Sequence, residues 1–253
     1  MSAWFRALRL RVSLLAALLA IASCEILRVD TPWLAIGAIF CITIVTMVQN
    51  DWRDRHHDAL KGKVLALTKP KAFLSLLLVL WTVSCTLIIL ASVGNMYAGA
   101  LLLFMALVAL VYSETRQVPL LPTILVAVAS ASSVLLPLAT RTTSGAIDLF
   151  FVSVLLIVFG REIFCDIQDK DIDGGYKVTL PLLVGERRAK AIAVIAIVCG
   201  LVLVATIEYV VLPGVLLTCI GLMILVKNSK QDRGRLWFDA GSALVILSLI
   251  AFG

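Results

Sequence analysis

The sequence predicts an all-α membrane protein, a polytopic bundle of about nine transmembrane helices that forms a single domain over residues 1–253. Hydrophobic residues make up 61% of the chain and charged residues only 15%, with a mean hydropathy of +1.05, which is not the composition of a soluble domain. Apolar stretches close to the roughly 20 residues that cross a bilayer recur along almost the whole sequence. Basic residues gather in alternate connections between these stretches, as in multi-pass proteins.

Each expected span is an apolar run with polar or helix-starting residues at its limits. The first run follows a basic segment, but Glu25 and Arg28 close it without a small-residue cleavage site, so we expect a retained span and not a signal peptide. Pro70, Pro119 and Pro213 lie near the starts of later runs, where the missing amide donor is tolerated. In chain order the expected spans are 11–28, 33–50, 72–92, 95–112, 119–139, 147–165, 190–208, 210–227 and 236–252.

The distribution of basic residues predicts the orientation of these spans. Nine spans place the amino terminus and the loops after spans two, four, six and eight on one side, which then carries 20 of the 22 Lys and Arg residues, leaving Arg28 and Arg141 for the other. The positive-inside rule makes the basic side cytoplasmic. The net charge of +6 does not indicate nucleic acid, because the basic residues lie in short juxtamembrane loops without stacking aromatics. Membrane lipid headgroups and a diphosphate are the expected partners.

Two acidic clusters with the same spacing follow the second and sixth spans, both on the predicted cytoplasmic side. Within each cluster three aspartates stand at positions i, i+3 and i+7, so on a helix they project from one side. Two such faces opposed across a cavity would bind Mg²⁺, which prefers carboxylate oxygen and substrate phosphate. The spacing therefore predicts a phosphorylated substrate, a diphosphate. The predicted metal ligands and catalytic residues are Asp51, Asp54, Asp58, Asp166, Asp169 and Asp173.

The residues around the clusters fit this chemistry. Four aspartates within residues 166–173 repel one another unless cations lie between them. Gly174 and Gly175 permit the tight turn that follows. Three lysines are candidates to contact the diphosphate oxygens as point charges, namely Lys61, Lys63 and Lys177.

The two motifs together resemble those of the UbiA-type intramembrane prenyltransferases. The resemblance rests on Asn50-Asp51-x-x-Asp54-x-x-x-Asp58 after the second span and on Asp166-x-x-Asp169-x-x-x-Asp173 after the sixth, preceded by Arg161-Glu162-Ile163 and followed by Thr179-Leu180-Pro181. It covers essentially the whole chain. Weaker matches add further substrate-binding candidates, namely Tyr112 with Ser113, Arg116, and Arg11 at the start of the first span.

The resemblance implies an all-helical bundle that encloses an apolar chamber, with its active site at the cytoplasmic face. It also implies that the aspartates hold Mg²⁺ and the diphosphate of an isoprenoid donor, with Asn50 supporting the first cluster. The expected reaction is transfer of a polyprenyl group to a small, hydrophobic or aromatic acceptor.

The chain departs from the family pattern at positions that bear on the acceptor. Leu65 to Pro70 replace the arginine-proline stretch that many members carry, and Pro122-Thr123 stand where a Gly-Asn pair is common. The acceptor is therefore left open. Two other readings compete with the transferase: an enzyme of the same fold that cyclises terpenes or transfers phosphoribose, and a non-enzymatic Mg²⁺ transporter or scaffold. A transporter predicts charges deep within several spans, whereas the acid here is concentrated at one face.

Overall fold

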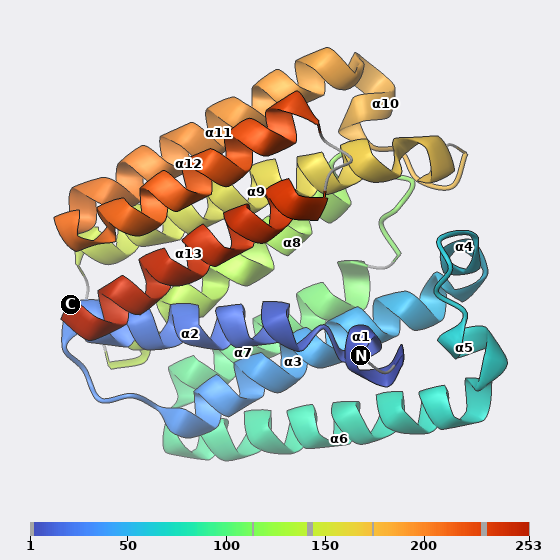
Figure 1. Ribbon diagram of the computed structural model, residues 1–253. Coiled ribbons are helices and arrows are strands. Elements are labelled where there is room, and N and C mark those ends of the chain that lie inside the picture. Colours follow the sequence, from blue (N-terminus) through green and yellow to red (C-terminus); the bar gives the residue numbers. More distant parts are fainter. Residues whose placement is uncertain (1–2, 113, 141–143, 174, 229–231, 253) are drawn as a thin grey trace. The chain divides into compact units, whose positions relative to one another are not determined.

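The protein is predominantly helical over the residues that its computed structural model describes, which are all except 1–2, 113, 141–143, 174, 229–231 and 253 (Figure 1). No strand occurs among these described residues, so the predicted all-α class is confirmed. The elements are α1 (Ala3–Leu8), α2 (Leu10–Leu27), α3 (Trp33–Arg53), α4 (Arg55–Leu60), α5 (Leu65–Thr68), α6 (Pro70–Gly94), α7 (Met96–Tyr112), α8 (Leu121–Ser132), η1 (Ser133–Thr140), α9 (Gly145–Asp173), α10 (Leu180–Val184), α11 (Glu186–Ile207), η2 (Tyr209–Val211), α12 (Leu212–Lys227) and α13 (Asp232–Phe252).

Each of the expected spans falls on a helix of the structure. Within the described residues, seven helices are long and apolar enough to cross a membrane: Leu10–Leu27, Trp33–Arg53, Pro70–Gly94, Leu121–Ala139, Glu186–Ile207, Tyr209–Lys227 and Arg233–Phe252. The apolar helix α7 has only 17 residues, and α9 carries Asp148, Arg161 and Glu162 along its apolar length. The count of nine transmembrane helices therefore stays a prediction.

Prolines mark helix starts and one change of helix type. Pro70, Pro122, Pro181 and Pro213 each occupy the first turn of a helix, where no intrahelical donor is needed. Pro137 lies inside η1, the tighter 3-10 segment into which α8 passes at Ser133. A proline in a helix interior lacks the amide donor and clashes with the preceding turn, which explains the change from α to 3-10 geometry.

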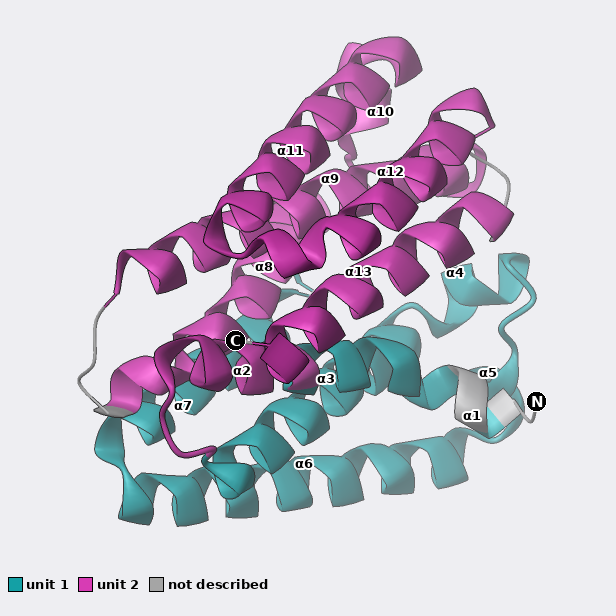
Figure 2. Cartoon of the chain, turned by 60° about the vertical axis from the view of Figure 1, so that its left-hand side comes forward, with its two compact units in different colours: residues 1–17, 32–115 teal, residues 18–31, 116–253 magenta. Residues whose placement is uncertain are grey.

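The chain divides into two compact units (Figure 2). Unit 1 comprises residues 1–17 and 32–115, and unit 2 comprises residues 18–31 and 116–253. The first acidic cluster belongs to unit 1 and the second to unit 2.

In unit 1, α3 packs against α6 and α7 around an apolar core that includes Val45, Val48 and Phe73. One buried polar side chain ties the three helices together. Gln49 of α3 accepts a hydrogen bond from Trp81 Nε1 of α6 at 2.9 Å and donates one to the Ala109 carbonyl of α7 at 3.4 Å. Such interhelical bonds satisfy polar groups that would otherwise be stranded among apolar side chains. They fix the end of α3 from which the first cluster extends.

In unit 2, helices pack at close range through glycines. A Cβ at Gly200 of α11 would lie 2.8 Å from the Ser153 carbonyl of α9, and the Ser153 hydroxyl donates to the Gly200 carbonyl at 2.8 Å. A Cβ at Gly221 of α12 would overlap the backbone of Phe238 in α13. Small residues of this kind let helix backbones approach each other in membrane proteins. The α9–α11 and α12–α13 pairs form the tight contacts of this unit.

Candidate functional site

The first acidic cluster lies where α3 ends and α4 begins. Asp51 occupies the last turn of α3, Asp54 caps it, and Asp58 lies in α4. The path stays helical across the junction, because the Asp54 amide donates to the Asn50 carbonyl at 2.8 Å and the Asp58 amide to the Asp54 carbonyl at 2.7 Å. The predicted helical placement of these aspartates is thus confirmed, and all three are buried.

Two cations lie against two of the buried carboxylates of this cluster, those of Asp51 and Asp58. Asp51 Oδ1 accepts a hydrogen bond from Arg9 Nη2 at 2.9 Å and lies 3.6 Å from Lys63 Nζ. The same ammonium lies 3.0 Å from Asp58 Oδ2. Lys63 therefore bridges two of the three predicted metal ligands. The sequence predicts a role for Lys63 but not for Arg9. Arg9 separates α1 from α2 and itself has a positive φ of 43°, and this turn allows its side chain to reach Asp51.

Aromatic side chains hold the segment that carries this cluster. Trp52 stacks on Phe73 with ring centroids 6.1 Å apart, and Trp4 stacks on the same ring at 6.3 Å. The Arg55 guanidinium lies 4.6 Å from the centre of the Trp52 ring and donates to the Trp52 carbonyl at 2.9 Å. These contacts anchor the junction of α3 and α4.

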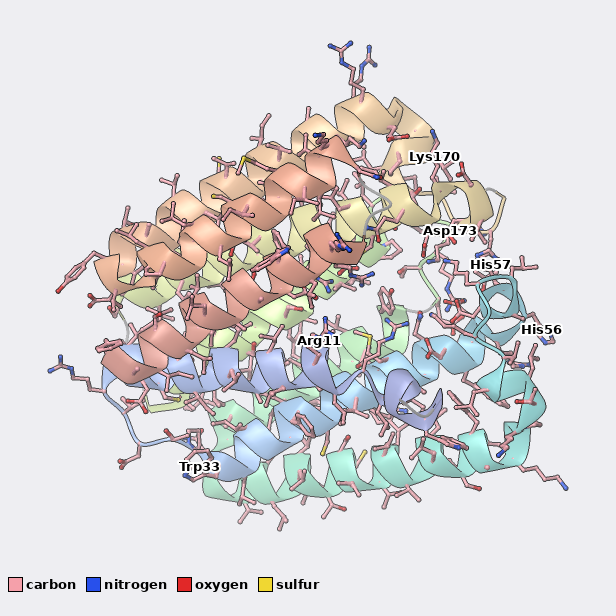
Figure 3. All side chains as sticks on the ribbon, in the orientation of Figure 1. Arg11, Trp33, His56, His57, Lys170 and Asp173 are labelled. Carbon is pink, nitrogen blue, oxygen red and sulfur yellow. The ribbon has the colours of Figure 1, made fainter. Side chains whose placement is uncertain are left out.

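The second acidic cluster lies on the last turns of α9. Asp173 (Figure 3) is fully buried. Its Oδ2 lies 3.5 Å from Lys177 Nζ. Asp166 is partly buried and accepts a hydrogen bond from the Thr123 hydroxyl of α8 at 3.3 Å. Asp169 lies between them along the helix and is partly buried, whereas Asp171 is exposed. Lys177 thus lies at the second cluster, as the sequence predicts.

The surroundings of Asp166 raise the pKa of its carboxyl. Burial, with a further contribution from the neighbouring Glu162 carboxylate, raises the pKa of Asp166 to about 7. The Lys177 ammonium and the hydrogen bond from Thr123 act in the opposite direction. A carboxyl in this position gains from a further positive charge, because a nearby cation stabilises its ionised form.

The loop after the second cluster is bound to the segment that follows α7. Arg116 Nη1 donates to the Tyr176 hydroxyl at 3.1 Å, and its guanidinium carbon lies 5.6 Å from the centre of the Tyr176 ring. Gln117 Nε2 donates to the Tyr176 carbonyl at 2.9 Å, and the Val178 amide donates to the Arg116 carbonyl at 3.1 Å. Gly175, with φ of 84°, makes the turn that the sequence predicts here. Arg116 is therefore brought to the loop of the second cluster.

A cluster of charged side chains that the sequence did not predict lies one helical turn before Asp166. Arg161 of α9 donates from Nη1 to Glu162 at 2.8 Å and from Nε to Asp239 of α13 at 3.2 Å. Asp239 is buried, although its sequence position lies close to the start of the last expected span. Nothing in the spacing of Arg161 and Asp239, which are 78 residues apart, indicates this pair.

The other predicted residues lie near the ends of helices. Arg11 is exposed in the first turn of α2 (Figure 3). Lys61 caps α4 and is partly buried, and Tyr112 is the last residue of α7. Asn50 is partly buried in the last turn of α3. Ser113, Gly174 and Arg141, which entered the sequence predictions, lie outside the described residues. Among the described side chains, no three His, Cys, Asp or Glu residues stand close enough to hold a metal ion as a group.

Comparison with known proteins adds a family and a fold. A model of the UbiA prenyltransferase family matches residues 11–247. The fold is similar to that of a UbiA homologue from Aeropyrum pernix K1 in its apo form, with a TM-score of 0.72, 18% identity, and coverage of 96% of this chain and 97% of the other.

Two further solved structures share the fold. A digeranylgeranylglyceryl phosphate synthase matches with a TM-score of 0.66, 17% identity and coverage of 99% and 98%. A UbiA homologue from Archaeoglobus fulgidus bound to DMAPP and Mg²⁺ matches with a TM-score of 0.60, 15% identity and full coverage, 100% of each chain. No curated protein matches the sequence.

Proposed function

Because the chain belongs to the UbiA prenyltransferase family, we propose that it transfers a polyprenyl group from an isoprenoid diphosphate to a small, aromatic acceptor in a Mg²⁺-dependent reaction. The donor and metal are supported by the structure of an Archaeoglobus fulgidus homologue bound to DMAPP and Mg²⁺. A second structure of a homologue from that organism is bound to GPP and Mg²⁺. The two acidic clusters of this chain support the same donor and the same metal.

The observation that carries the proposal is the single ammonium shared by two buried aspartates. Lys63 Nζ lies 3.0 Å from Asp58 and 3.6 Å from Asp51. Asp51 and Asp54 lie at the carboxyl end of α3, where the helix dipole disfavours negative charge. Acidic side chains in this place do not stabilise the helix, and burying their charge is costly unless a cation lies beside it. Cation binding is therefore the role that best explains them.

The donor atoms present fit Mg²⁺. Each cluster offers carboxylate oxygens, and Mg²⁺ is held in proteins by one or two carboxylates together with substrate phosphate and water. A site of that kind does not need three protein ligands close together. This agrees with the described side chains, among which no three His, Cys, Asp or Glu residues stand close enough to hold a metal ion. When bound, Mg²⁺ stabilises the negative charge on the departing diphosphate. We propose that Asp51, Asp54, Asp58, Asp166, Asp169 and Asp173 are the metal ligands, with one or two of these carboxylates bound to each ion.

The basic residues complete the proposed charge balance. Lys63 and Lys177 already lie against aspartates of the two clusters, and a diphosphate would give their ammonium groups a second anionic partner. We propose that Lys61, Arg116 and Arg11 contribute to diphosphate binding in the same way. Tyr112 and Asn50 are proposed to position the donor and the first cluster. Their common effect would be to orient the donor and to stabilise the negative charge that the diphosphate gains as the allylic carbon–oxygen bond breaks.

The apolar helices supply the setting for this reaction. Seven apolar helices and membership of the family make the chain an integral membrane protein. We propose that helices of the bundle enclose an apolar chamber for the prenyl tail, which excludes water from the carbocation-like centre. We further propose that the amino terminus and both aspartate motifs face the cytoplasm, because 20 of the 22 Lys and Arg residues fall on that side when nine spans are assumed.

The proposal is tested by presenting the purified protein with geranyl, farnesyl, geranylgeranyl and longer polyprenyl diphosphates, with and without Mg²⁺, and with a panel of phenolic acceptors. Diphosphate release and lipid products are followed by mass spectrometry. The proposal predicts Mg²⁺-dependent release together with a prenylated acceptor. Release accompanied only by a hydrocarbon or terpene alcohol would replace it with a cyclase. No release from any donor would favour phosphoribosyl transfer or a non-enzymatic role.

A further inference from the structure

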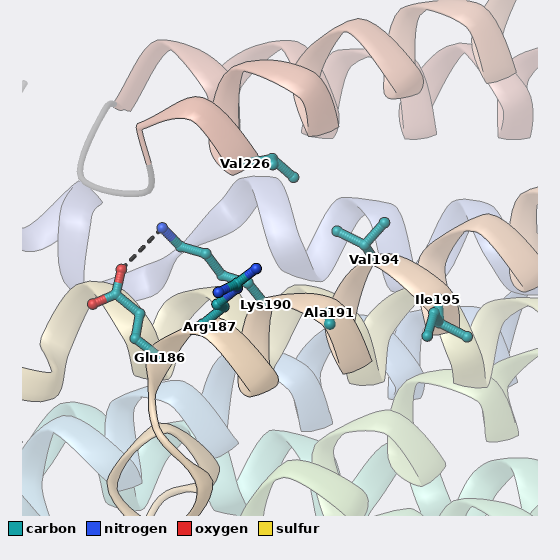
Figure 4. A pocket seen from close by; sticks show the side chains of 7 residues that line it. All are labelled: Glu186, Arg187, Lys190, Ala191, Val194, Ile195 and Val226. Carbon is teal, nitrogen blue, oxygen red and sulfur yellow. Dashed lines mark ion pairs between the residues drawn. The ribbon is translucent and has the colours of Figure 1, made fainter.

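A groove lies on unit 2, away from both acidic clusters in sequence. It is formed by the start of α11 and the end of α12 and has a volume of about 620 Å³. This is within the roughly 300–1,000 Å³ of typical ligand sites. Its lining is shown in Figure 4 and consists of Glu186, Arg187, Lys190, Ala191, Val194, Ile195 and Val226.

Helix packing explains why this groove is open. The helix α11 is bound closely to α9 and α12 closely to α13, in both cases through glycines that let backbones touch. In contrast, α11 and α12 contact each other sparsely although they follow each other in the chain. The seam between the two tight pairs is therefore left unfilled at the end where Val226 and Glu186 lie.

The groove is basic at one end and apolar along the rest. Arg187 and Lys190 line it, and Arg188 and Lys227 are adjacent to lining residues in the sequence. Among the described lining residues, Glu186 carries the single negative charge, and it is paired with Lys190 at 2.9 Å (Figure 4). The balance of charge at this end is positive and suits an anion.

The apolar part extends along the helix from the basic end. Arg187 and Ile195 are eight residues apart, which is roughly 12 Å along a helix axis. Ile195 is 63% exposed and Val226 is 42% exposed, so the apolar surface is open to the surroundings of the helices. In an integral membrane protein these surroundings are acyl chains. A charged end followed by an apolar channel suits an amphiphilic anion, and the amphiphilic anion that surrounds helices in a membrane is a phospholipid with an anionic headgroup.

We propose that the groove between α11 and α12 binds an anionic phospholipid, with its phosphate at Arg187 and Lys190 and one acyl chain along Ala191, Val194 and Ile195. Basic pockets between membrane helices bind acidic headgroups by the same physical logic. Arginine supplies a fork of donors that matches phosphate oxygens, and lysine supplies a point charge. This site goes beyond the proposed transferase activity and does not depend on it, because none of its residues belongs to the acidic clusters.

The test is retention of lipid by the purified protein, measured by native mass spectrometry in detergent. Phosphatidylglycerol and phosphatidylcholine with the same acyl chains are titrated separately, and inorganic phosphate is added as a competitor. The protein is expected to bind phosphatidylglycerol at least about tenfold more tightly than phosphatidylcholine. The double variant Arg187→Gln/Lys190→Gln is expected to lose about thirtyfold in affinity, since each basic residue near the surface contributes about a fivefold preference.

Two more variants separate the headgroup from the acyl chain. Ala191→Phe fills the apolar channel while keeping both cations, and it is expected to weaken phosphatidylglycerol binding without changing the melting temperature. Lys69→Gln/Lys71→Gln removes two exposed basic residues elsewhere and should leave binding unchanged.

Equal binding of the two lipids, or unchanged binding in the Arg187/Lys190 double variant, would overturn the proposal. Complete displacement by inorganic phosphate with no effect of Ala191→Phe would also overturn it, because the site would then bind free phosphate. All these measurements are made without turnover, so their failure is distinct from failure of the proposed reaction.

Discussion

Replacing Asp51 with asparagine keeps the size of the side chain and removes its charge. The Asp51 side chain is only 10% exposed, and its Oδ1 lies 2.9 Å from Arg9 and 3.6 Å from Lys63. The side chains of Arg9 and Lys63 are 33% and 45% exposed, so water screens both ion pairs. We therefore expect a loss of only about 1–2 kcal/mol of stability, less than the roughly 3–5 kcal/mol for breaking a fully buried pair.

The effect on the proposed reaction is expected to be much larger. Loss of one group that stabilises charge in a transition state lowers kcat by about 100- to 1,000-fold, or roughly 3–4 kcal/mol. The assay is Mg²⁺-dependent diphosphate release at saturating donor, measured beside the melting temperature of the same preparation. Glu114→Gln is the matched control, because Glu114 pairs with Arg53 at 3.0 Å and both side chains are more than half exposed. An Asp51→Asn protein that turns over within twofold of the unmodified chain would refute the reasoning.

Four further predictions concern unit 2. Because the pKa of Asp166 is raised to about 7, protons compete with Mg²⁺ for this carboxylate below neutrality. The apparent Kd for Mg²⁺, measured by calorimetry, should therefore rise about tenfold per pH unit below pH 7 and be constant above it. Thr123→Val removes a hydrogen bond that lowers this pKa, so the inflection should move up by about half to one pH unit; an unmoved inflection would contradict the assignment to Asp166. Asp239→Asn leaves Arg161 with one acidic partner fewer and should lower stability by about 2–4 kcal/mol, seen as a lower melting temperature, whereas an unchanged value would show that the pair is solvated. Gly221→Leu places a side chain against the Phe238 backbone and should cause a loss of folded protein in detergent. The control is Gly94→Leu, because an added Cβ at Gly94 meets no atom within 4 Å. Equal yields of the two variants would contradict the close approach of α12 and α13.

The helices were predictable because span length and apolar composition are local properties of the chain. The run that became α6 was predicted as residues 72–92, and the helix extends from Pro70 to Gly94, so its existence and its approximate limits follow from the sequence. The helical spacing of Asp51, Asp54 and Asp58 was predictable for the same reason. The division into α3 and α4 at Asp54 was not predictable, since no proline or glycine marks it.

The side chains that contact the aspartates were harder to predict from the sequence, because these contacts depend on how the helices pack. Lys63 follows Asp58 closely in the chain, and its contact with the cluster could be expected. Arg9 reaches Asp51 from 42 residues away through a turn at positive φ, which a single sequence does not reveal. The pairing of Arg116 with Tyr176 likewise needs two distant segments to be adjacent.

The most direct test of the account is equilibrium binding of a nonreactive isoprenoid diphosphate analogue to the purified protein, with and without Mg²⁺. Asp51→Asn and Asp166→Asn are measured beside the unmodified chain. If the acidic clusters hold the diphosphate through Mg²⁺, the unmodified protein binds the analogue only when Mg²⁺ is present, and each variant loses most of that binding. Equal binding without Mg²⁺, or full Mg²⁺-dependent binding in both variants, would contradict the assignment of these aspartates.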